Sequence, residues 1–520
     1  MLRRYKPVGV FLPVALFLML AAAPQALGQP GQLRLEYTVE VSSVPDKLFH
    51  VTTEIRNIRE PRLHLSLPIW TPGWYTVENY AKNILRFKVS DSKGAPVAHT
   101  MTRKQTWAVE TKGVDYIKVE FDYRAAVLAL NQAKIADDFA FFTGTQLFLL
   151  PEGHRRLPST VNFRVPQGWN VVSALKETSN PLTFTSTDYD TLVDSPTQMG
   201  RFDLAKFEVD GKPHYFAGAP AGVFSPEKIE QMKEVLGAIA LTQKDVFGAL
   251  PYEKYVYFYF FTQAESNASG GLEHGNSFVA FHPEGANALP QYMARLAAHE
   301  FFHVWNVKRI RPAELWPYDY SREVETPLLW VSEGFTNYYA ALTLYRAGLA
   351  DRKAFLRQVG GVISTIEGNE ARKYISMASA SVSTWLGYDT PVAFSISYYP
   401  GGQNLAALLD LSIIHDTGGA SSLDDVMRAL YQSSYLKGKG FSAEDLIGII
   451  NRITKRDYHE FFRRHVWGVE VPAYNTYLGY AGFRLNEGNA GEIVEVPQPT
   501  PAQIKVREKW LKAKNQNGSR

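Results

Sequence analysis

The stretch Ala297-Ala298-His299-Glu300-Phe301-Phe302-His303 constrains the fold of this chain more than any other. Four residues advance a helix by about one turn, so His299 and His303 share one helix face and are stacked for a single ion. Glu300 lies beside them, in reach of a water molecule that the ion would activate. The spacing therefore predicts a helix that lines a metal site, and other segments must complete that site.

The third metal ligand is expected at Glu333, within the apolar and aromatic segment Leu329–Tyr339. Two histidines need one more protein ligand if a fourth position is to stay open for water. A charged carboxylate among apolar residues costs free energy unless a cation pairs with it, which favours the ligand role. The alternative is a glutamate on the surface of a helix. Asn337 follows by four residues and is expected to accept the free ring N–H of one histidine. The chain has no cysteine, so histidines and carboxylates must hold any metal.

A near copy of the motif occurs at Tyr458-His459-Glu460-Phe461-Phe462-Arg463-Arg464-His465. Its two histidines are six residues apart, about 240° around a helix, and cannot share an ion. We expect a surface or packing feature there.

Two further segments carry candidate substrate contacts. Gly270 and Gly271 would let a peptide backbone approach an edge strand, and Glu273 would bind its positively charged N-terminus. A tight turn with a solvated glutamate is the alternative. Tyr398 and Tyr399 are candidates to donate a hydrogen bond to a developing oxyanion, and residue types alone do not choose between them.

Hydrophobic patterning divides the chain, whose 520 residues are too many for one ordinary domain. From Gln32 to Gly218, short alternating runs predict antiparallel strands in a β-sandwich. Within them, the residue types of Leu67–Tyr75 favour a packing role. Helical periodicity begins with the N-cap Ser225 and dominates after Leu289. Helices are expected at about 290–307, 325–347, 351–366, 401–416, 422–435 and 442–453. The fold class is multidomain α+β, with a β-sandwich domain at 29–218, a mostly helical domain at 219–484 and a tail at 485–520.

Residues 1–28 are typical of a signal peptide. Three basic residues precede the apolar run Val8–Ala23, and a small-residue cleavage site lies near Gly28. The run is shorter than the roughly 20 residues that span a bilayer. We expect a periplasmic or secreted protein without stable membrane insertion after cleavage; an uncleaved anchor is the alternative.

The charge balance argues against a nucleic-acid partner. A net charge of +3 arises from 55 basic and 52 acidic residues, and no basic stripe is visible. The oligomeric state stays open.

The chain resembles the glycyl aminopeptidase family of zinc metallopeptidases, which are thermolysin-like gluzincins related to aminopeptidase N. The resemblance covers about residues 35–483, and its run from His299 to Pro312 is the most specific part. It implies a thermolysin-like catalytic domain, one zinc ion per chain and removal of N-terminal residues from peptides, with glycine or alanine preferred. Other segments that match are Trp70-Thr71-Pro72-Gly73, Leu192-Val193-Asp194-Ser195-Pro196, Gly270-Gly271-Leu272-Glu273-His274, Trp330-Val331-Ser332-Glu333-Gly334-Phe335-Thr336 and Tyr398-Tyr399.

The resemblance also implies roles for single residues. It assigns zinc to His299, His303 and Glu333. It gives the role of general base to Glu300 and substrate-amine binding to Glu273. The related Tyr-x-Lys-Gly pattern falls on Tyr399-Pro400-Gly401-Gly402, which selects Tyr399 as the oxyanion donor.

This sequence departs from the family pattern in two ways. Gly401 replaces the usual lysine, which changes the charge expected near the site. The 36 residues from Leu485 are too few for the PDZ domain that such enzymes usually carry, so we expect that module to be absent.

Two other functions fit part of the pattern. An open cleft without Glu273 at its end would favour a thermolysin-type zinc endopeptidase. A degenerate site would leave a peptide-binding protein.

Overall fold

The computed structural model describes residues 31–261, 270–282, 290–387, 394–489 and 491–512. The expected signal peptide, 1–28, lies outside these residues. Within the described ranges, no helix is long and apolar enough to cross a membrane.

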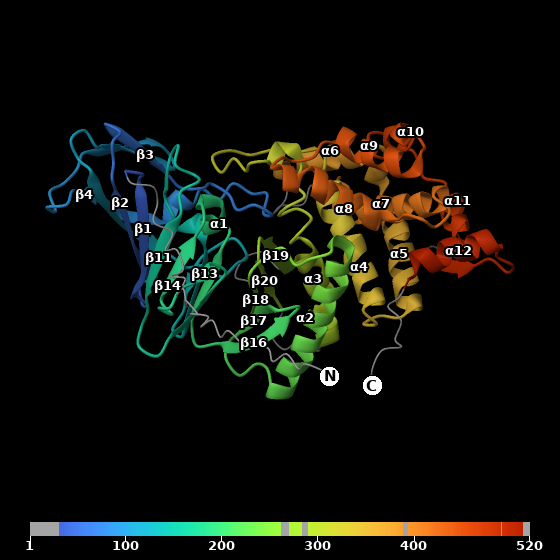
Figure 1. The fold of residues 1–520 in the computed structure, drawn as a ribbon, viewed down its shortest axis with the longest axis horizontal. Coiled ribbons are helices and arrows are strands. Elements are labelled where there is room, and N and C mark those ends of the chain that lie inside the picture. The colour runs from blue at the N-terminus through green and yellow to red at the C-terminus, as the bar shows by residue number, and fades with distance from the viewer. Residues whose placement is uncertain (1–30, 262–269, 283–289, 388–393, 490, 513–520) are drawn as a thin grey trace, which may run out of the picture.

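A seven-stranded sheet forms the outer layer of the N-terminal half (Figure 1). Its strands alternate between buried and partly exposed residues, as in β2, where Phe49, Val51 and Ile55 point inward. This period of two is the pattern of a sheet with one face on a core. In spatial order the strands are β13 (Lys176–Glu177), β14 (Thr183–Ser186), β11 (Ser159–Arg164), β1 (Arg34–Ser43), β2 (Leu48–Arg56), β7 (Tyr116–Arg124) and β4 (Ile84–Ser90).

Two four-stranded sheets cover the inner face of this layer. One has the order β10 (Leu150–Pro151), β3 (Arg62–Ser66), β6 (Thr106–Glu110) and β5 (His99–Arg103). The other has the order β12 (Asn170–Ser173), β15 (Pro196–Gly200), β9 (Phe139–Thr143) and β8 (Lys134–Ile135). The layers meet through aromatic rings: Phe49 lies 5.5 Å from Phe142, and Phe87 lies 4.5 Å from Trp107. The predicted sandwich is confirmed, although β1 and β11 pair in parallel.

A mixed five-stranded sheet joins the sandwich to the helices. Its order is β16 (Asp203–Val209), β17 (Lys212–Ala219), β18 (Tyr255–Phe260), β20 (Ser277–Phe281) and β19 (Gly270–His274). The glycine-rich strand β19 is thus at an edge, as expected. The expected domain limit at 218 would cut this sheet, because β17 pairs with β18. A limit between Gly200 and Asp203 keeps every sheet whole.

Helices make up most of the remaining chain. The main ones are α2 (Pro226–Phe247), α3 (Pro290–Phe302), α4 (Thr336–Arg346), α5 (Arg352–Glu367), α6 (Met377–Val382), α7 (Tyr398–Asp416), α8 (Leu423–Ser433), α9 (Ala443–Thr454), α10 (His459–His465) and α11 (Tyr474–Tyr480). The α3 helix ends at Phe302, earlier than expected, so His303 lies in the turn that follows it. The expected helix 325–347 begins as a π-helix, η4 (Trp330–Phe335).

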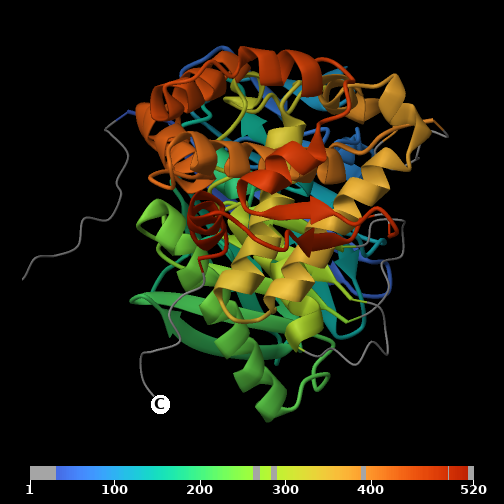
Figure 2. The same cartoon turned by 90° about the vertical axis from the view of Figure 1, so that its right-hand side faces the viewer.

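The C-terminal segment is not the tail that was expected. After α11 the chain forms a hairpin of β21 (Phe483–Leu485) and β22 (Ile493–Glu495), then α12 (Pro501–Trp510). In Figure 2 these red segments lie across the yellow helices. Trp510 is fully buried, and its indole N–H donates to the Tyr338 hydroxyl at 2.8 Å. The helix begins with a Thr500–Gln503 capping box and Pro501, and its buried residues are Val506 and Trp510, four residues apart.

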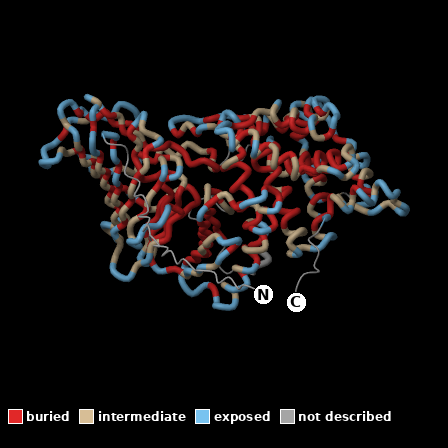
Figure 3. Tube along the Cα trace, viewed as in Figure 1, coloured by how far each residue is buried: buried red, intermediate tan, exposed pale blue. Residues whose placement is uncertain are grey.

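The two halves share one core. Buried residues continue from the sandwich through the central sheet into the helices (Figure 3). This continuity fixes loops of the N-terminal half against the segment that carries the histidines.

Candidate metal and active site

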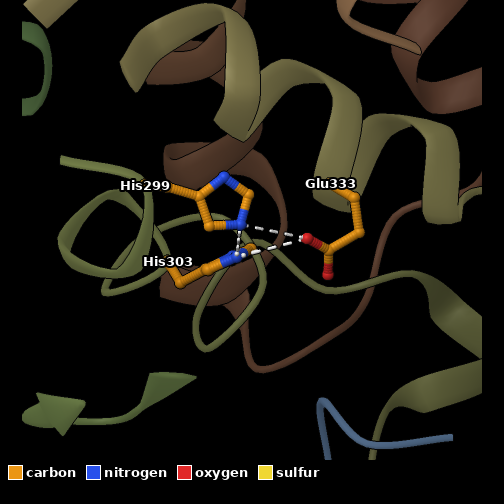
Figure 4. A group of neighbouring side chains, drawn as sticks. All are labelled: His299, His303 and Glu333. Carbon is orange, nitrogen blue, oxygen red and sulfur yellow. Dashed lines mark hydrogen bonds and ion pairs between the residues drawn. The ribbon is translucent and has the colours of Figure 1, made fainter. Parts of the chain in front are cut away.

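His299, His303 and Glu333 converge at one point (Figure 4). The two histidine Nε2 atoms are 3.0 Å apart, and Glu333 Oε2 lies 3.4 Å from His299 Nε2 and 3.3 Å from His303 Nε2. Tetrahedral zinc with bonds near 2.0–2.1 Å separates its ligand atoms by about 3.3–3.4 Å. These three side chains therefore fit a single zinc-sized ion with one position left for water.

Asn306 orients His303 and ties its segment to η4. The Asn306 carbonyl accepts a hydrogen bond from His303 Nδ1 at 2.6 Å, which leaves Nε2 free to face the metal position. The Asn306 amide donates to the carbonyls of Val331 and Ser332 at 2.9 and 3.1 Å. This role of Asn306 was not predicted from the sequence.

The π-helix aims Glu333 at the histidines. Such wider turns are rare and concentrate at functional sites. Beside Glu333, Gly334 packs directly on Gly402 of α7, and a Cβ at either glycine would overlap the backbone of the other segment. Two glycines thus let η4 and α7 approach closely and fix the position of Glu333.

The site holds more negative than positive charge. Burial opposes the charged form of Glu333, but His303 and His299 lower its pKa to about 2. Burial likewise opposes the charged form of His303, whereas Glu333, Glu273 and Glu300 raise its pKa to about 10. Three buried carboxylates around two histidines form a set that favours a bound cation.

Asn337 lies near His299 in the structure. Burial lowers the pKa of His299, and hydrogen bonding to Glu333 and Asn337 opposes this effect. The Nδ1 atom of His299 is buried and makes no well-formed hydrogen bond within the described part of the chain. Asn337 is thus near enough to orient this ring.

Glu300 faces the edge strand. Burial raises its pKa well above the ordinary value. A Cβ added to Gly271 would overlap the Glu300 carboxylate, so this position of β19 tolerates only glycine without rearrangement. The predicted strand and the predicted base are therefore in direct contact.

Glu273 lies near the C-terminal end of the same strand, β19. Burial raises its pKa to about 7. Its Oε1 is buried and accepts no hydrogen bond from any described residue. Gly73 covers it from the N-terminal half: a Cβ there would lie 2.6 Å from Oε1, and the φ of +99° also requires glycine. The loop Leu67–Tyr75 thus contributes to the site as well as to packing.

A buried ion pair supports this end of the strand. Lys308 Nζ lies 2.8 Å from Asp194 Oδ1, and His274 Nδ1 lies 3.1 Å from the same oxygen. Asp194 Oδ2 accepts the Gly275 N–H at 2.8 Å. Asp194 comes from the N-terminal half, so the pair fixes Glu273's neighbour, His274, across the two halves. The segment Leu192–Pro196, which contains Asp194 and resembles a family segment, was given no role from the sequence.

Both candidate tyrosines line the site. The Tyr399 ring stacks on His299 with centroids 6.3 Å apart. The Tyr398 hydroxyl lies 3.0 Å from Thr384 Oγ1, and burial raises its pKa far above the ordinary value. Two residues after Tyr399, a Cβ on Gly401 would overlap the Met377 sulfur. The methionine thus occupies the space beside residue 401, where the family pattern has a lysine.

A cavity of about 1120 Å³ connects these groups. It is lined by the three metal-ligand candidates, by Glu300 and Glu273, and by Gly73 and Trp74 of the N-terminal half. Its walls combine a metal position, a buried base and a carboxylate with an unpaired oxygen. This arrangement can activate water and hold the amino group of a peptide.

Comparisons with known proteins agree with the site. The model of the Peptidase M61 N-terminal domain matches residues 36–201, and that of M61 glycyl aminopeptidase matches residues 292–405. The two models together cover more than half of the chain. No match was found among curated proteins.

Solved structures show the same fold. An aminopeptidase N family protein from Idiomarina loihiensis aligns with a TM-score of 0.79 and 24% identity, over 86% of this chain and 78% of that one. An M1 zinc metallopeptidase from Deinococcus radiodurans aligns with a TM-score of 0.52 and 16% identity, over 86% and 96%. A mutant of the latter, bound to a Tyr-Ser-Ala substrate, aligns with a TM-score of 0.53 and 16% identity, over the same shares. The matching sequence models and the metal-binding constellation lead to one conclusion: the chain belongs to the M61 glycyl aminopeptidase family of metallopeptidases.

Proposed function

We propose that this enzyme is a zinc-dependent aminopeptidase that removes small N-terminal residues, glycine or alanine, from peptides. The observation that carries the proposal is Glu273, a buried carboxylate in the cavity lining near His303, whose Oε1 accepts no hydrogen bond from any described residue. A peptide's ammonium group is the natural partner for such an oxygen. An endopeptidase would need the cavity open at Glu273, whereas Gly73 and Trp74 line it.

His299, His303 and Glu333 would hold one zinc ion per chain. When bound, zinc would act as a Lewis acid: it would polarise the scissile carbonyl and lower the pKa of water, so that water loses a proton readily and becomes a nucleophile. Glu300 takes the proton from the attacking water and returns it to the leaving amine. Its burial, which favours the protonated form, suits this second transfer.

The oxyanion donor is assigned to Tyr399. Its ring stacks on that of His299, one of the metal-ligand candidates. Tyr399 is also in the first turn of α7, whose N-terminal amide dipoles favour negative charge nearby. The two effects together would stabilise the tetrahedral transition state.

The preference for small residues and the export of the enzyme rest on the sequence. Export is tested by N-terminal sequencing of the mature protein, which should begin near Gln29.

The decisive experiment compares alanyl-aminomethylcoumarin with N-acetylated peptides. The free amine should be required, so acetylation should lower kcat/KM by about 100-fold or more, the effect of losing a buried charged pair. Glu273→Gln should lose most of this preference, and the exposed control Glu253→Gln should keep it. Equal rates on acetylated peptides would instead identify a thermolysin-type endopeptidase. Purified protein without zinc or hydrolysis would identify a peptide-binding protein.

A further inference from the structure

Acidic side chains outnumber basic ones in the described lining of the active-site cavity. Its acidic lining residues, Glu273, Glu300 and Glu333, surround the metal position. Among the described residues that line it, Arg295 is the only arginine or lysine. The place of this cation relative to the bound peptide decides what it can recognise.

The contacts between β19 and α3 give the direction of the cavity. Gly271 lies against Glu300, and the carbonyl of Gly275, just after the strand, accepts a hydrogen bond from Arg309, nine residues after Glu300. The strand and the helix therefore run past each other in the same direction. A peptide whose amino group is at Glu273 must extend from there toward the N-terminal end of α3.

Arg295 lies at that far end. It precedes His299 by four residues, so both side chains share the helix face that lines the cavity. At 1.5 Å per residue the two positions are about 6 Å apart along the axis. Gly270 and its strand partner Phe281 line the same end of the cavity. The arginine is thus on the side where the leaving part of a peptide must lie.

Among the described residues, none pairs with the guanidinium of Arg295. No carboxylate, hydrogen-bond acceptor or aromatic ring in the described ranges contacts it. By contrast, Arg309 at the other end of this segment donates to three carbonyls. Arg295 is exposed, and partial burial of its guanidinium lowers the pKa. Arginine stays charged in proteins and prefers carboxylates, which it binds through two parallel hydrogen bonds.

We propose that Arg295 binds a carboxylate on the leaving side of the substrate, and that this group is the C-terminal carboxylate of a short peptide. This inference rests on the proposed function, because Glu273 must hold the amino end. An extended peptide rises about 3.4 Å per residue, so the second or third residue reaches the level of Arg295. The cavity then complements both charges of a dipeptide or tripeptide.

The test compares three peptides that differ in one charge: Ala-Gly-Gly, its C-terminal amide, and Ala-Gly-Glu amide. The wild-type enzyme should favour the free carboxylate over the amide by about 10- to 100-fold in kcat/KM, the range of charge-assisted hydrogen bonds. In Arg295→Gln this ratio should fall to about one, and Arg295→Lys should give an intermediate value. Arg357→Gln, on the exposed surface of α5, should keep the wild-type ratio.

Binding supplies a second readout that needs no turnover. Calorimetry with Glu300→Gln should show the same preference for Ala-Gly-Gly in Kd, and the double variant with Arg295→Gln should lose it. An unchanged ratio in Arg295→Gln would overturn the inference. A preference for Ala-Gly-Glu amide alone would overturn the C-terminal assignment. Alanyl-aminomethylcoumarin has no carboxylate, so its hydrolysis tests the aminopeptidase function without Arg295. If the enzyme cleaves it but shows no preference for Ala-Gly-Gly, only the inference about Arg295 fails.

Discussion

The chain contains the letters His-Glu-Phe-Phe twice, and the two copies behave in opposite ways. In the turn that follows α3, His303 exposes 1% of its side chain, and its nitrogen converges with His299 and Glu333. On α10, His459 exposes 51%, and its two ring nitrogens face Asp457 and Glu444. The same residue types thus make a metal position in one place and a solvated ion pair in the other.

Burial explains the difference in chemistry. It raises the pKa of Glu300 and lowers that of His299. The exposed Glu460 shows the reverse, because Arg463 lowers its pKa, and Asp457 and Glu444 raise the pKa of His459. A short motif therefore specifies residue types, while the second histidine's spacing and the surrounding core decide the function.

The largest effect is expected from removing a metal ligand. His303→Ala should lose bound zinc and lower kcat/KM by at least about 10⁴-fold, since Lewis-acid and water activation both depend on the ion. Metal analysis and hydrolysis of alanyl-aminomethylcoumarin measure the two losses. His465→Ala, the matched change on α10, should keep both metal and activity. Equal zinc content in the two variants would contradict the assignment.

Replacing the base should separate catalysis from metal binding. Glu300→Gln should lower kcat by about 10²- to 10⁴-fold, the usual contribution of a positioned general base, with zinc content unchanged. Glu460→Gln should leave kcat at the wild-type value, because that carboxylate only pairs with Arg463 on the surface. Wild-type turnover by Glu300→Gln would refute its role.

An aspartate pairs with a basic residue near each copy of the motif. The Asp194–Lys308 pair is buried, whereas the Asp457–His459 pair is exposed. Asp194→Asn leaves Lys308 uncompensated in the core, so it should lower the free energy of unfolding by about 3–5 kcal/mol. Asp457→Asn, beside the exposed His459, should leave the unfolding midpoint unchanged. Urea unfolding followed by tryptophan fluorescence measures both changes.

The same pair predicts a dependence on pH. Burial opposes the charge of Asp194, but Lys308 and His274 lower its pKa to about 2, below the ordinary value of 3.8. Its folded-state pKa is depressed, so its contribution is complete above about pH 4 and is lost as the pH falls toward 2. The shift corresponds to about 2 kcal/mol. In Asp194→Asn, the free energy of unfolding should therefore fall less between about pH 4 and pH 2 than in the wild type. An equal fall in both proteins would mean that other groups cause it.

The smallest effect is expected from one methyl group. Gly271→Ala would overlap the Glu300 carboxylate and displace it, so kcat/KM should fall by about 10- to 100-fold with metal retained. Gly448→Ala on α9, next to α10, has open space around the new Cβ and should keep full activity. An active Gly271→Ala would show that the strand yields at this position.

Local pattern determined much of the architecture. Alternation predicted the sandwich, and the N-cap Ser225 marked the start of α2. Four-residue spacing placed His299 and His303 on one face. These features follow from interactions within a few residues of one another, which a sequence displays directly.

Contacts between distant segments decided the rest. Nothing local indicates that Gly73 covers Glu273, or that Asp194 pairs with Lys308 across 114 residues. The segment 485–520 was expected to be a tail, because the few apolar residues of α12 meet their partners only in the folded core. The sequence by itself determined a helix that presents two histidines and an acid. Only the tertiary structure decided that η4 delivers Glu333 to them, because that requires two glycines, Gly334 and Gly402, to meet from separate helices.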